Sequence, residues 1–170
     1  MKTTEFFPQA EIYQKIKRIL EETLLFLGVF IEGKPKLEHI GSSAIPNALS
    51  KLDLDIQIRV TREFFKKAVE ELSFWYEPHH KELWNNDFAL FTEKHDGIPV
   101  DFVLTVIDSK YDNFFKVRDF FIKNPVALQK YNELKKQYEG KSYEEYSKAK
   151  SAFFGPHNEL STFKKNFSTS

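Results

Sequence analysis

The sequence has no cysteine, no excess of charge of either sign and no long apolar segment, and each absence excludes a class of protein. Without cysteine among its 170 residues, the chain has no disulfide framework and no thiol chemistry, and it suits a reducing compartment. The 25 basic residues balance the 25 acidic ones. The composition therefore does not predict generic binding to duplex nucleic acid, although it leaves room for a local basic pocket.

The most apolar stretch, residues 23–31, is too short to span a membrane. It has nine residues, whereas a bilayer-spanning helix needs about 20. Residues 1–10 also lack the apolar core of a signal peptide. We therefore expect a cytoplasmic protein with no membrane partner, in which residues 23–31 are buried in the core.

What the sequence does have is aromatic mass and regular periodicity. Its 18 phenylalanines and 7 tyrosines suffice for a substantial core in a single domain spanning residues 1–170. The patterns predict strands at 36–40, 53–60, 88–92 and 98–106, and helices at 8–27, from 62, and at about 110–123, 125–139 and 142–154. The fold class is therefore α+β. We expect a mixed β-sheet core with flanking helices in about 1–107, a C-terminal helical cap in about 108–154, and a tail in 155–170.

Two carboxylates mark the start of the second predicted strand. Asp53 and Asp55 are two residues apart, so they face the same side with their Cα atoms roughly 6–7 Å apart. Such anions repel unless a cation lies between them, and hard oxygen ligands suit Mg²⁺. Asp53 could alternatively be a turn or cap residue. Asp55 lies within an apolar run, where an unpaired carboxylate is costly.

Asp101 is a third carboxylate, within the almost entirely apolar residues 98–106. In a central strand it would be either a metal ligand or a salt-bridge partner. With Asp53 and Asp55 it could hold two metal ions about 3.5–4 Å apart. Asp101 could also act as the general base for an acceptor hydroxyl group.

A phosphate site is predicted where the first sheet strand ends. Gly41 allows a ligand to approach the backbone, and Ser42 and Ser43 add N–H and hydroxyl groups at the start of a short helix. The alternative is an ordinary glycine turn followed by a capping serine. Lys51, just before the acidic strand, would either touch phosphate or be solvated.

The three C-terminal helices each place one basic residue within a stripe of aromatic residues: Arg118, Lys135 and Lys150. For a single residue, the simplest interpretation is an aliphatic stem that packs while its charge reaches water. Since all three helices share the feature, we expect these residues to converge on the rim of the carboxylate site, where they face phosphate or pair with the acids.

The ordered motifs resemble those of the GrpB family, within the nucleotidyltransferase superfamily. The residues that carry the resemblance are His39-Ile40-Gly41-Ser42, Ile45-Pro46, Lys51, Asp53-Leu54-Asp55, Arg118-Asp119, Asn124-Pro125, Tyr131 to Lys135, and Tyr146 with Lys150 and Phe153. It covers roughly residues 36–154. Leu52 stands where one subgroup has glycine, and a His-x-His feature near Asp101 is missing.

The resemblance implies a minimal nucleotidyltransferase-like core and a Mg²⁺-dependent enzyme. Such an enzyme would move a nucleoside monophosphate group from a nucleoside triphosphate to an unidentified acceptor, with the three aspartates as catalytic metal ligands. One alternative is a non-catalytic protein that binds a nucleotide or phosphometabolite in the same pocket. Another is an interaction protein whose acidic pair is structural.

Overall fold

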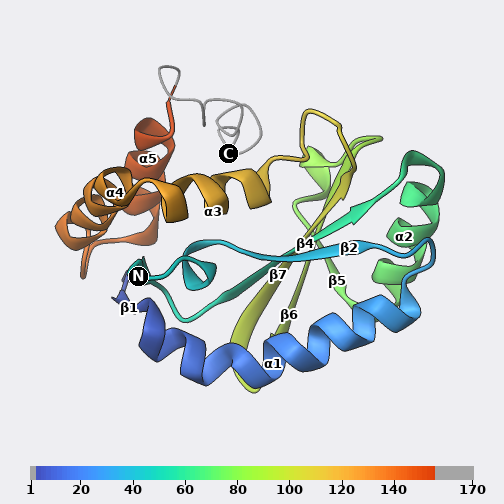
Figure 1. Cartoon of the computed structure of the whole chain (residues 1–170), viewed down its shortest axis with the longest axis horizontal. Helices are drawn as coiled ribbons and strands as arrows, with labels where there is room; N and C mark the ends of the chain where they lie inside the picture. Colours follow the sequence, from blue (N-terminus) through green and yellow to red (C-terminus); the bar gives the residue numbers. More distant parts are fainter. Residues whose placement is uncertain (1–2, 156–170) are drawn as a thin grey trace.

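A five-stranded mixed sheet lies at the centre of the computed structural model, which describes residues 3–155 (Figure 1). The strand order is β2-β4-β7-β6-β5, where β4 and β7 are parallel and all other neighbours are antiparallel. The bounds are β2 Lys36–Ile40, β4 Leu54–Val60, β5 Glu77–His79, β6 Phe88–His95 and β7 Ile98–Val106. The predicted α+β class, with its mixed sheet, is confirmed.

Helices α1 (Gln9–Phe30) and α2 (Arg62–Trp75) cover one face of this sheet (Figure 1). Alternation along β4 sends Leu54, Ile56 and Ile58 toward these helices, and all three are fully buried. They belong to the main hydrophobic core. Since every second side chain of β4 is used in this way, the residues between them face the other side of the sheet.

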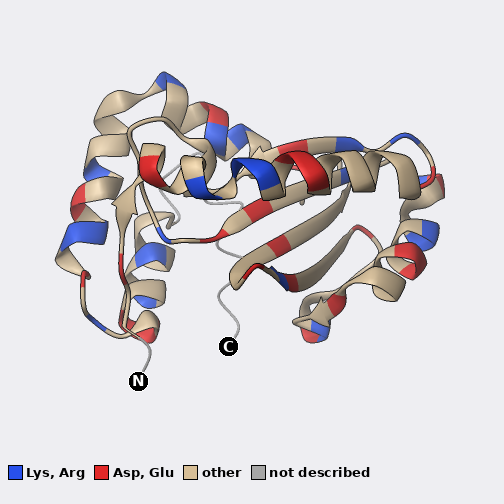
Figure 2. Ribbon diagram, turned by 90° about the horizontal axis from the view of Figure 1, so that it is seen from below, with Lys and Arg blue, Asp and Glu red and all other residues tan. Residues whose placement is uncertain are grey.

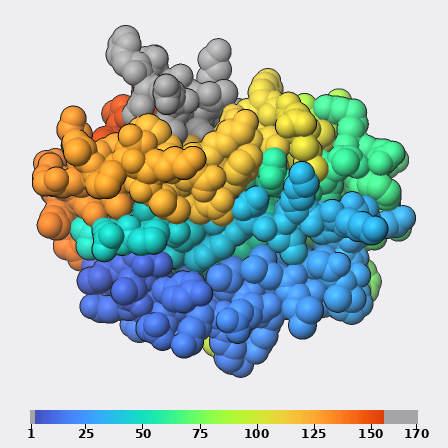
Figure 3. Space-filling view, viewed as in Figure 1, coloured from blue at the N-terminus to red at the C-terminus, as the bar shows by residue number. Residues whose placement is uncertain are grey.

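The other face meets a cap of three helices, α3 (Phe114–Lys123), α4 (Pro125–Gln137) and α5 (Tyr143–Phe153). A second hydrophobic cluster, with Phe121, Leu128 and Tyr131 from the cap, joins these helices to Ile45 and Ala48 after β2. Figure 3 shows the cap lying directly over this segment of the chain. The cap is therefore packed against the region predicted to bind phosphate.

Short elements connect the chain's beginning to the cap. Strand β1 (Phe7–Pro8) pairs with β3 (Leu49–Ser50), and two 3₁₀ helices, η1 (Ser42–Ala44) and η2 (Lys81–Leu83), lie between strands. The Thr4 N–H donates to the Lys141 carbonyl at 2.9 Å, and the Gly140 N–H donates to the Thr4 carbonyl at 2.9 Å. None of these pairings was predicted from the sequence.

Several predicted boundaries shift by a few residues. Gly28 does not end the first helix, which continues to Phe30 because the Ile31 N–H still donates to the Leu27 carbonyl. Residues 23–31 are only partly core, since Leu25, Val29 and Phe30 are exposed. Within residues 3–155, no helix is both long enough and apolar enough to cross a bilayer. The predicted tail, apart from residue 155, lies outside the described residues.

Candidate functional site

The structure brings Asp55 and Asp101 side by side. They are register partners on the parallel strands β4 and β7, and on its other side Asp55 is paired with Ile40 of β2. Register partners on neighbouring strands point their side chains to the same face. The two predicted acids and the end of β2 therefore meet on the face of the sheet opposite α1 and α2.

Gly41, which follows β2 directly, lies against the carboxylate of Asp55. A Cβ atom built on Gly41 would overlap that carboxylate, and the glycine has a φ of +72°, which other residues rarely adopt. Both features require glycine here. They place the backbone at the start of the predicted phosphate loop directly beside the acid.

Several neighbouring charges act on the carboxyl group of Asp55. Burial, followed by the negative charges of Asp53 and Asp101, raises the pKa of Asp55 to about 7. Lys51 and Lys150 act in the opposite direction on the same carboxyl group. Asp55 therefore keeps its proton to a higher pH than an ordinary aspartate does, and an added cation would favour its ionised form.

The other two acids already have partners. Asp53 pairs with Lys51 through a 2.7 Å contact, and Asp101 accepts a 2.7 Å hydrogen bond from the Thr92 hydroxyl. Within residues 3–155, no three carboxylate or imidazole groups are gathered closely enough to hold a metal ion. The donor chemistry, three carboxylates that repel one another, nevertheless fits Mg²⁺.

Lys135 extends from α4 to the loop after β2. Its side chain is 1% exposed, and its ammonium group donates to the Ser42 hydroxyl at 2.6 Å and to the Leu49 carbonyl. It also lies 4.0 Å from the centre of the Tyr131 ring. Burial, then the charge of Lys150, lowers the pKa of Lys135 well below its usual value. The cap thus brings the buried amino group of Lys135 directly to Ser42.

Ser43 has a structural position. It is fully buried, its hydroxyl is 3.0 Å from His39 Nε2, and its carbonyl accepts from the Gln9 amide at 2.9 Å. Burial and the nearby Arg118 charge lower the pKa of His39 to about 4, so this histidine is neutral at physiological pH. The Ser43 side chain is consequently already engaged in the core of the loop.

The three basic residues predicted to converge on the acids are placed differently. Lys135 and Lys150 both lie close enough to the acids for the charges to affect one another's pKa, and Lys150 is exposed. Arg118 instead donates to Glu38 at 2.9 Å, to the His39 carbonyl at 2.9 Å and to Asp119 at 2.8 Å. Arg118 therefore joins α3 to β2. Lys51, and not Arg118, is the third basic residue beside the acids.

Further polar residues on this face escaped the sequence analysis. The Asp112 carboxylate accepts from Arg59 through Nε at 2.7 Å and Nη2 at 2.8 Å, and from the Gln57 amide at 3.0 Å. The sequence could have indicated Gln57 and Arg59, because Asp55, Gln57 and Arg59 alternate with apolar residues along β4. Thr92 and the Tyr131–Tyr146 hydroxyl pair, 3.3 Å apart, carry no comparable pattern.

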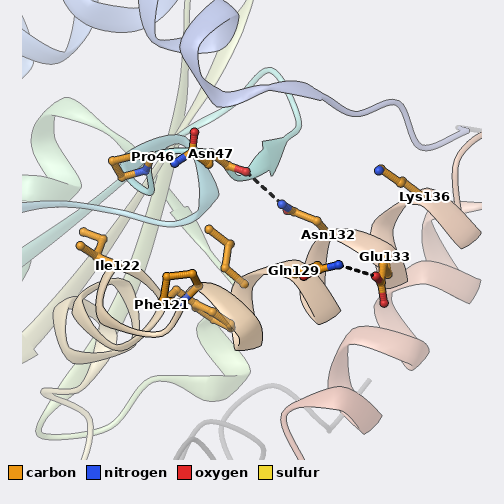
Figure 4. A pocket seen from close by; sticks show the side chains of 10 residues that line it. Pro46, Asn47, Phe121, Ile122, Gln129, Asn132, Glu133 and Lys136 are labelled. Carbon is orange, nitrogen blue, oxygen red and sulfur yellow. Dashed lines mark hydrogen bonds between the residues drawn. The ribbon is translucent and has the colours of Figure 1, made fainter.

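A groove of about 310 Å³ lies beside the loop after η1 (Figure 4). Its walls come from Pro46 and Asn47, from the end of α3 and from one side of α4 along most of its length. Asn132 fixes this loop, accepting from the Leu49 N–H at 2.8 Å and donating to the Asn47 carbonyl at 2.9 Å. None of the predicted site residues lines the groove, so it is separate from the carboxylate site.

Comparison with known protein sequences gives a family match and a similar protein. The sequence model of the GrpB protein family matches residues 8–159. A relative in Vibrio cholerae serotype O1, the UPF0157 protein VC_A0354, is 39% identical over 117 residues. That match covers 69% of this chain and 62% of the relative's length, so the relative extends well beyond the matched region.

Of two similar solved structures, the first supports the fold. The crystal structure of the conserved protein GrpB from Enterococcus faecalis is similar with a TM-score of 0.60 and 21% identity, covering 79% of this chain and 80% of that one. The Cid1 poly(U) polymerase with MgGTP bound matches with a TM-score of 0.47 and 13% identity, over 72% of this chain and 41% of that one. On the match to the family model over residues 8–159, the chain belongs to the GrpB family.

Proposed function

We propose that this protein is a Mg²⁺-dependent nucleotidyltransferase, which moves a nucleoside monophosphate group from a nucleoside triphosphate to an acceptor. The observation that carries the proposal is the meeting of Asp55, Asp101 and Gly41 at one point of the sheet. A glycine backbone held against two adjacent carboxylates offers a place where phosphate and a divalent cation can share one site.

The acids are the residues proposed to hold Mg²⁺. Asp55 and Asp101 project from neighbouring strands, and Asp53 would join them by leaving its contact with Lys51. A bound Mg²⁺ would neutralise the phosphate charge that develops during transfer. Ionised Asp55 would be favoured in that state because the cation offsets the repulsion that raises its pKa.

The basic residues are proposed to bind the triphosphate. Lys135 orients the Ser42 hydroxyl by donating a hydrogen bond to it. Lys150 is exposed and Lys51 is partly exposed, and the charges of both act on Asp55. In the reaction, the acceptor hydroxyl oxygen would form a bond to the α-phosphorus as the bond to the pyrophosphate oxygen breaks. Asp101 would receive the hydroxyl proton on the carboxylate oxygen that does not accept from Thr92, because the Thr92 hydroxyl donates to Oδ1.

The test is transfer of label from α-labelled triphosphates, in the presence of Mg²⁺, to a panel of hydroxyl-bearing small molecules, RNA and protein. We expect transfer that Asp55→Asn abolishes, by at least about a hundredfold. Asp96→Asn is the matched control, because Asp96 is an exposed acid at the turn between β6 and β7 that pairs with Arg18 of α1, the helix on the opposite face of the sheet from the acids.

Two results would contradict the proposal. Mg²⁺-dependent nucleotide binding without transfer to any acceptor would favour the non-catalytic binding protein. Transfer that is unchanged in Asp55→Asn would show that the acids of β4 and β7 are not the reacting site.

A further inference from the structure

An apolar patch at the far end of the molecule has no part in the proposed reaction. Nine large apolar side chains are exposed within residues 3–155, and five of them gather where α1 and α2 end: Leu25, Val29, Phe30, Phe74 and Trp75. Leu25 is 72% exposed and Phe74 is 78% exposed. Solvent-exposed apolar side chains that cluster in this way mark interaction surfaces more often than single exposed residues do.

Ring contacts between the two helices make the patch continuous. Phe26 and Phe30 of α1 lie 5.2 Å and 5.9 Å from the Trp75 ring of α2, and Phe74 lies 4.8 Å from it. Leu25 and Val29 extend the same surface along α1, one helical turn apart. Two helix ends therefore form a single platform with aromatic residues at its centre.

Most of the charged residues next to this platform are acidic. Within four residues along the chain of its exposed apolar residues there are six glutamates and one lysine: Glu21, Glu22, Glu32, Glu70, Glu71 and Glu77, with Lys34. Figure 2 shows α1 without charge between its last acidic turn and the residues after its end. On the N-terminal side, the nearest basic residues along the chain are Arg18 and Lys67, each seven residues before the first exposed apolar residue of its helix, and Arg18 pairs with Glu22 at 3.3 Å.

The charge pattern decides between candidate occupants. A second copy of this chain would bring the same glutamates against one another, and like charges facing across an interface are unfavourable. An anionic membrane surface would be repelled for the same reason. A partner with apolar residues on one side and lysine or arginine at the edges would cover the exposed apolar side chains and pair with the glutamates beside them.

We propose that the α1–α2 platform is a docking surface for a basic amphipathic helix of another protein. The helix would lay its apolar side chains over Trp75, Phe74 and Leu25, and its flanking cations would pair with the glutamates. Exposed aromatic side chains that become buried at the centre of an interface supply most of the binding energy. The proposal is independent of the catalytic site, which lies on the opposite face of the sheet.

The test uses two synthetic 18-residue amphipathic helices, one of leucine and lysine and one of leucine and glutamate, titrated calorimetrically into the full chain. We expect the lysine peptide to bind and the glutamate peptide to bind at least about tenfold more weakly. Phe74→Ser with Trp75→Ser should weaken binding of the lysine peptide at least about thirtyfold. Glu21→Lys with Glu70→Lys should weaken it at least about tenfold.

Val126→Ser is the matched control, because Val126 is an apolar residue that is 69% exposed but lies on α4. It should leave the affinity unchanged, and thermal unfolding should confirm that every variant is folded. The proposal is overturned by equal binding of the two peptides, or by binding that survives Phe74→Ser with Trp75→Ser. Concentration-dependent dimerisation that this double variant abolishes would also overturn it in favour of a second copy.

Discussion

At the scale of single residues, the charge of Asp55 links the site to the stability of the fold. Its pKa is about 7 in the folded protein, above the ordinary aspartate value, because of burial and the charges of Asp53 and Asp101. Between about pH 4 and pH 7 the folded state thus holds a proton that the unfolded chain has released. The free energy of unfolding of the metal-free protein should fall as pH rises through this window, by on the order of 2–4 kcal/mol from this group.

Urea unfolding at pH 5, 6, 7 and 8 in the presence of a chelator measures this effect. In Asp55→Asn the loss of stability toward pH 8 should disappear. His39 acts in the opposite direction, since its pKa is lowered to about 4 and its contribution is lost as pH falls below about 6.5. In Asp55→Asn the free energy of unfolding should therefore rise between pH 5 and pH 6. A pH profile of Asp55→Asn that matches that of the unmodified chain would refute the raised pKa of Asp55.

Gly41 is the residue whose replacement tests the contact between the loop and the acid. Gly41→Ala should be destabilised by strain at positive φ and by overlap with Asp55, together on the order of 3–4 kcal/mol. Gly97→Ala is the matched control, because Gly97 has a φ of +80° and no atom within 4 Å of the built Cβ. It should cost only about 1–2 kcal/mol. Equal losses of unfolding free energy in urea would show that the carboxylate does not crowd Gly41.

At the scale of elements, β4 separates the two sides of the molecule by alternation alone. Its apolar residues supply the core, and Asp55, Gln57 and Arg59 face the cap. Asp112, just before α3, satisfies Arg59 and Gln57 together, and the pKa of Asp112 is lowered: its hydrogen bonds, chiefly with Arg59, outweigh the opposing effect of burial. One carboxylate thereby attaches the start of the cap to a central strand.

Asp112→Ala should leave the buried Arg59 charge with only its longer 3.5 Å contact to Glu38, and lower the free energy of unfolding by about 3–5 kcal/mol. Asp119→Ala, which removes the much more exposed partner of Arg118, should cost less than about 1 kcal/mol. Chemical unfolding of both variants at pH 7 provides the comparison. A loss below about 1 kcal/mol in Asp112→Ala would mean that the buried pair does not hold the cap.

Local patterns predicted most elements because each depends on its own residues. The spacing of Ile12, Ile16 and Ile19 specifies a helix wherever its partner lies, and all three are buried. Local patterns do not predict which strands become neighbours, because the pairing of β4 with β7 joins residues that are 46 apart in the sequence, such as Asp55 and Asp101. The sequence predicted that these acids would converge, but their register and the position of Arg118 depend on contacts that no local pattern encodes.

At the scale of the whole molecule, the site lies where the sheet meets the helical cap. The core supplies Asp55, Asp101 and Gly41, whereas α4 supplies Lys135. The beginning of the chain ties the two parts together, since Thr4 exchanges hydrogen bonds with Gly140 and Lys141. We therefore expect residues 3–155 to unfold as one cooperative unit, as the single domain expected from the sequence would.

Phe6→Ala tests this expectation. Phe6 is 9% exposed and its ring lies 5.0 Å from that of Tyr146 on α5, so the variant should lose about 3–4 kcal/mol of unfolding free energy. In a cooperative unit, native-state hydrogen exchange should then show equal losses of protection in α5 and in β4. Phe74→Ala, at a largely exposed position, should change neither. Faster exchange in α5 alone would show that the cap opens independently of the sheet, and the site would then be assembled only when the cap is closed.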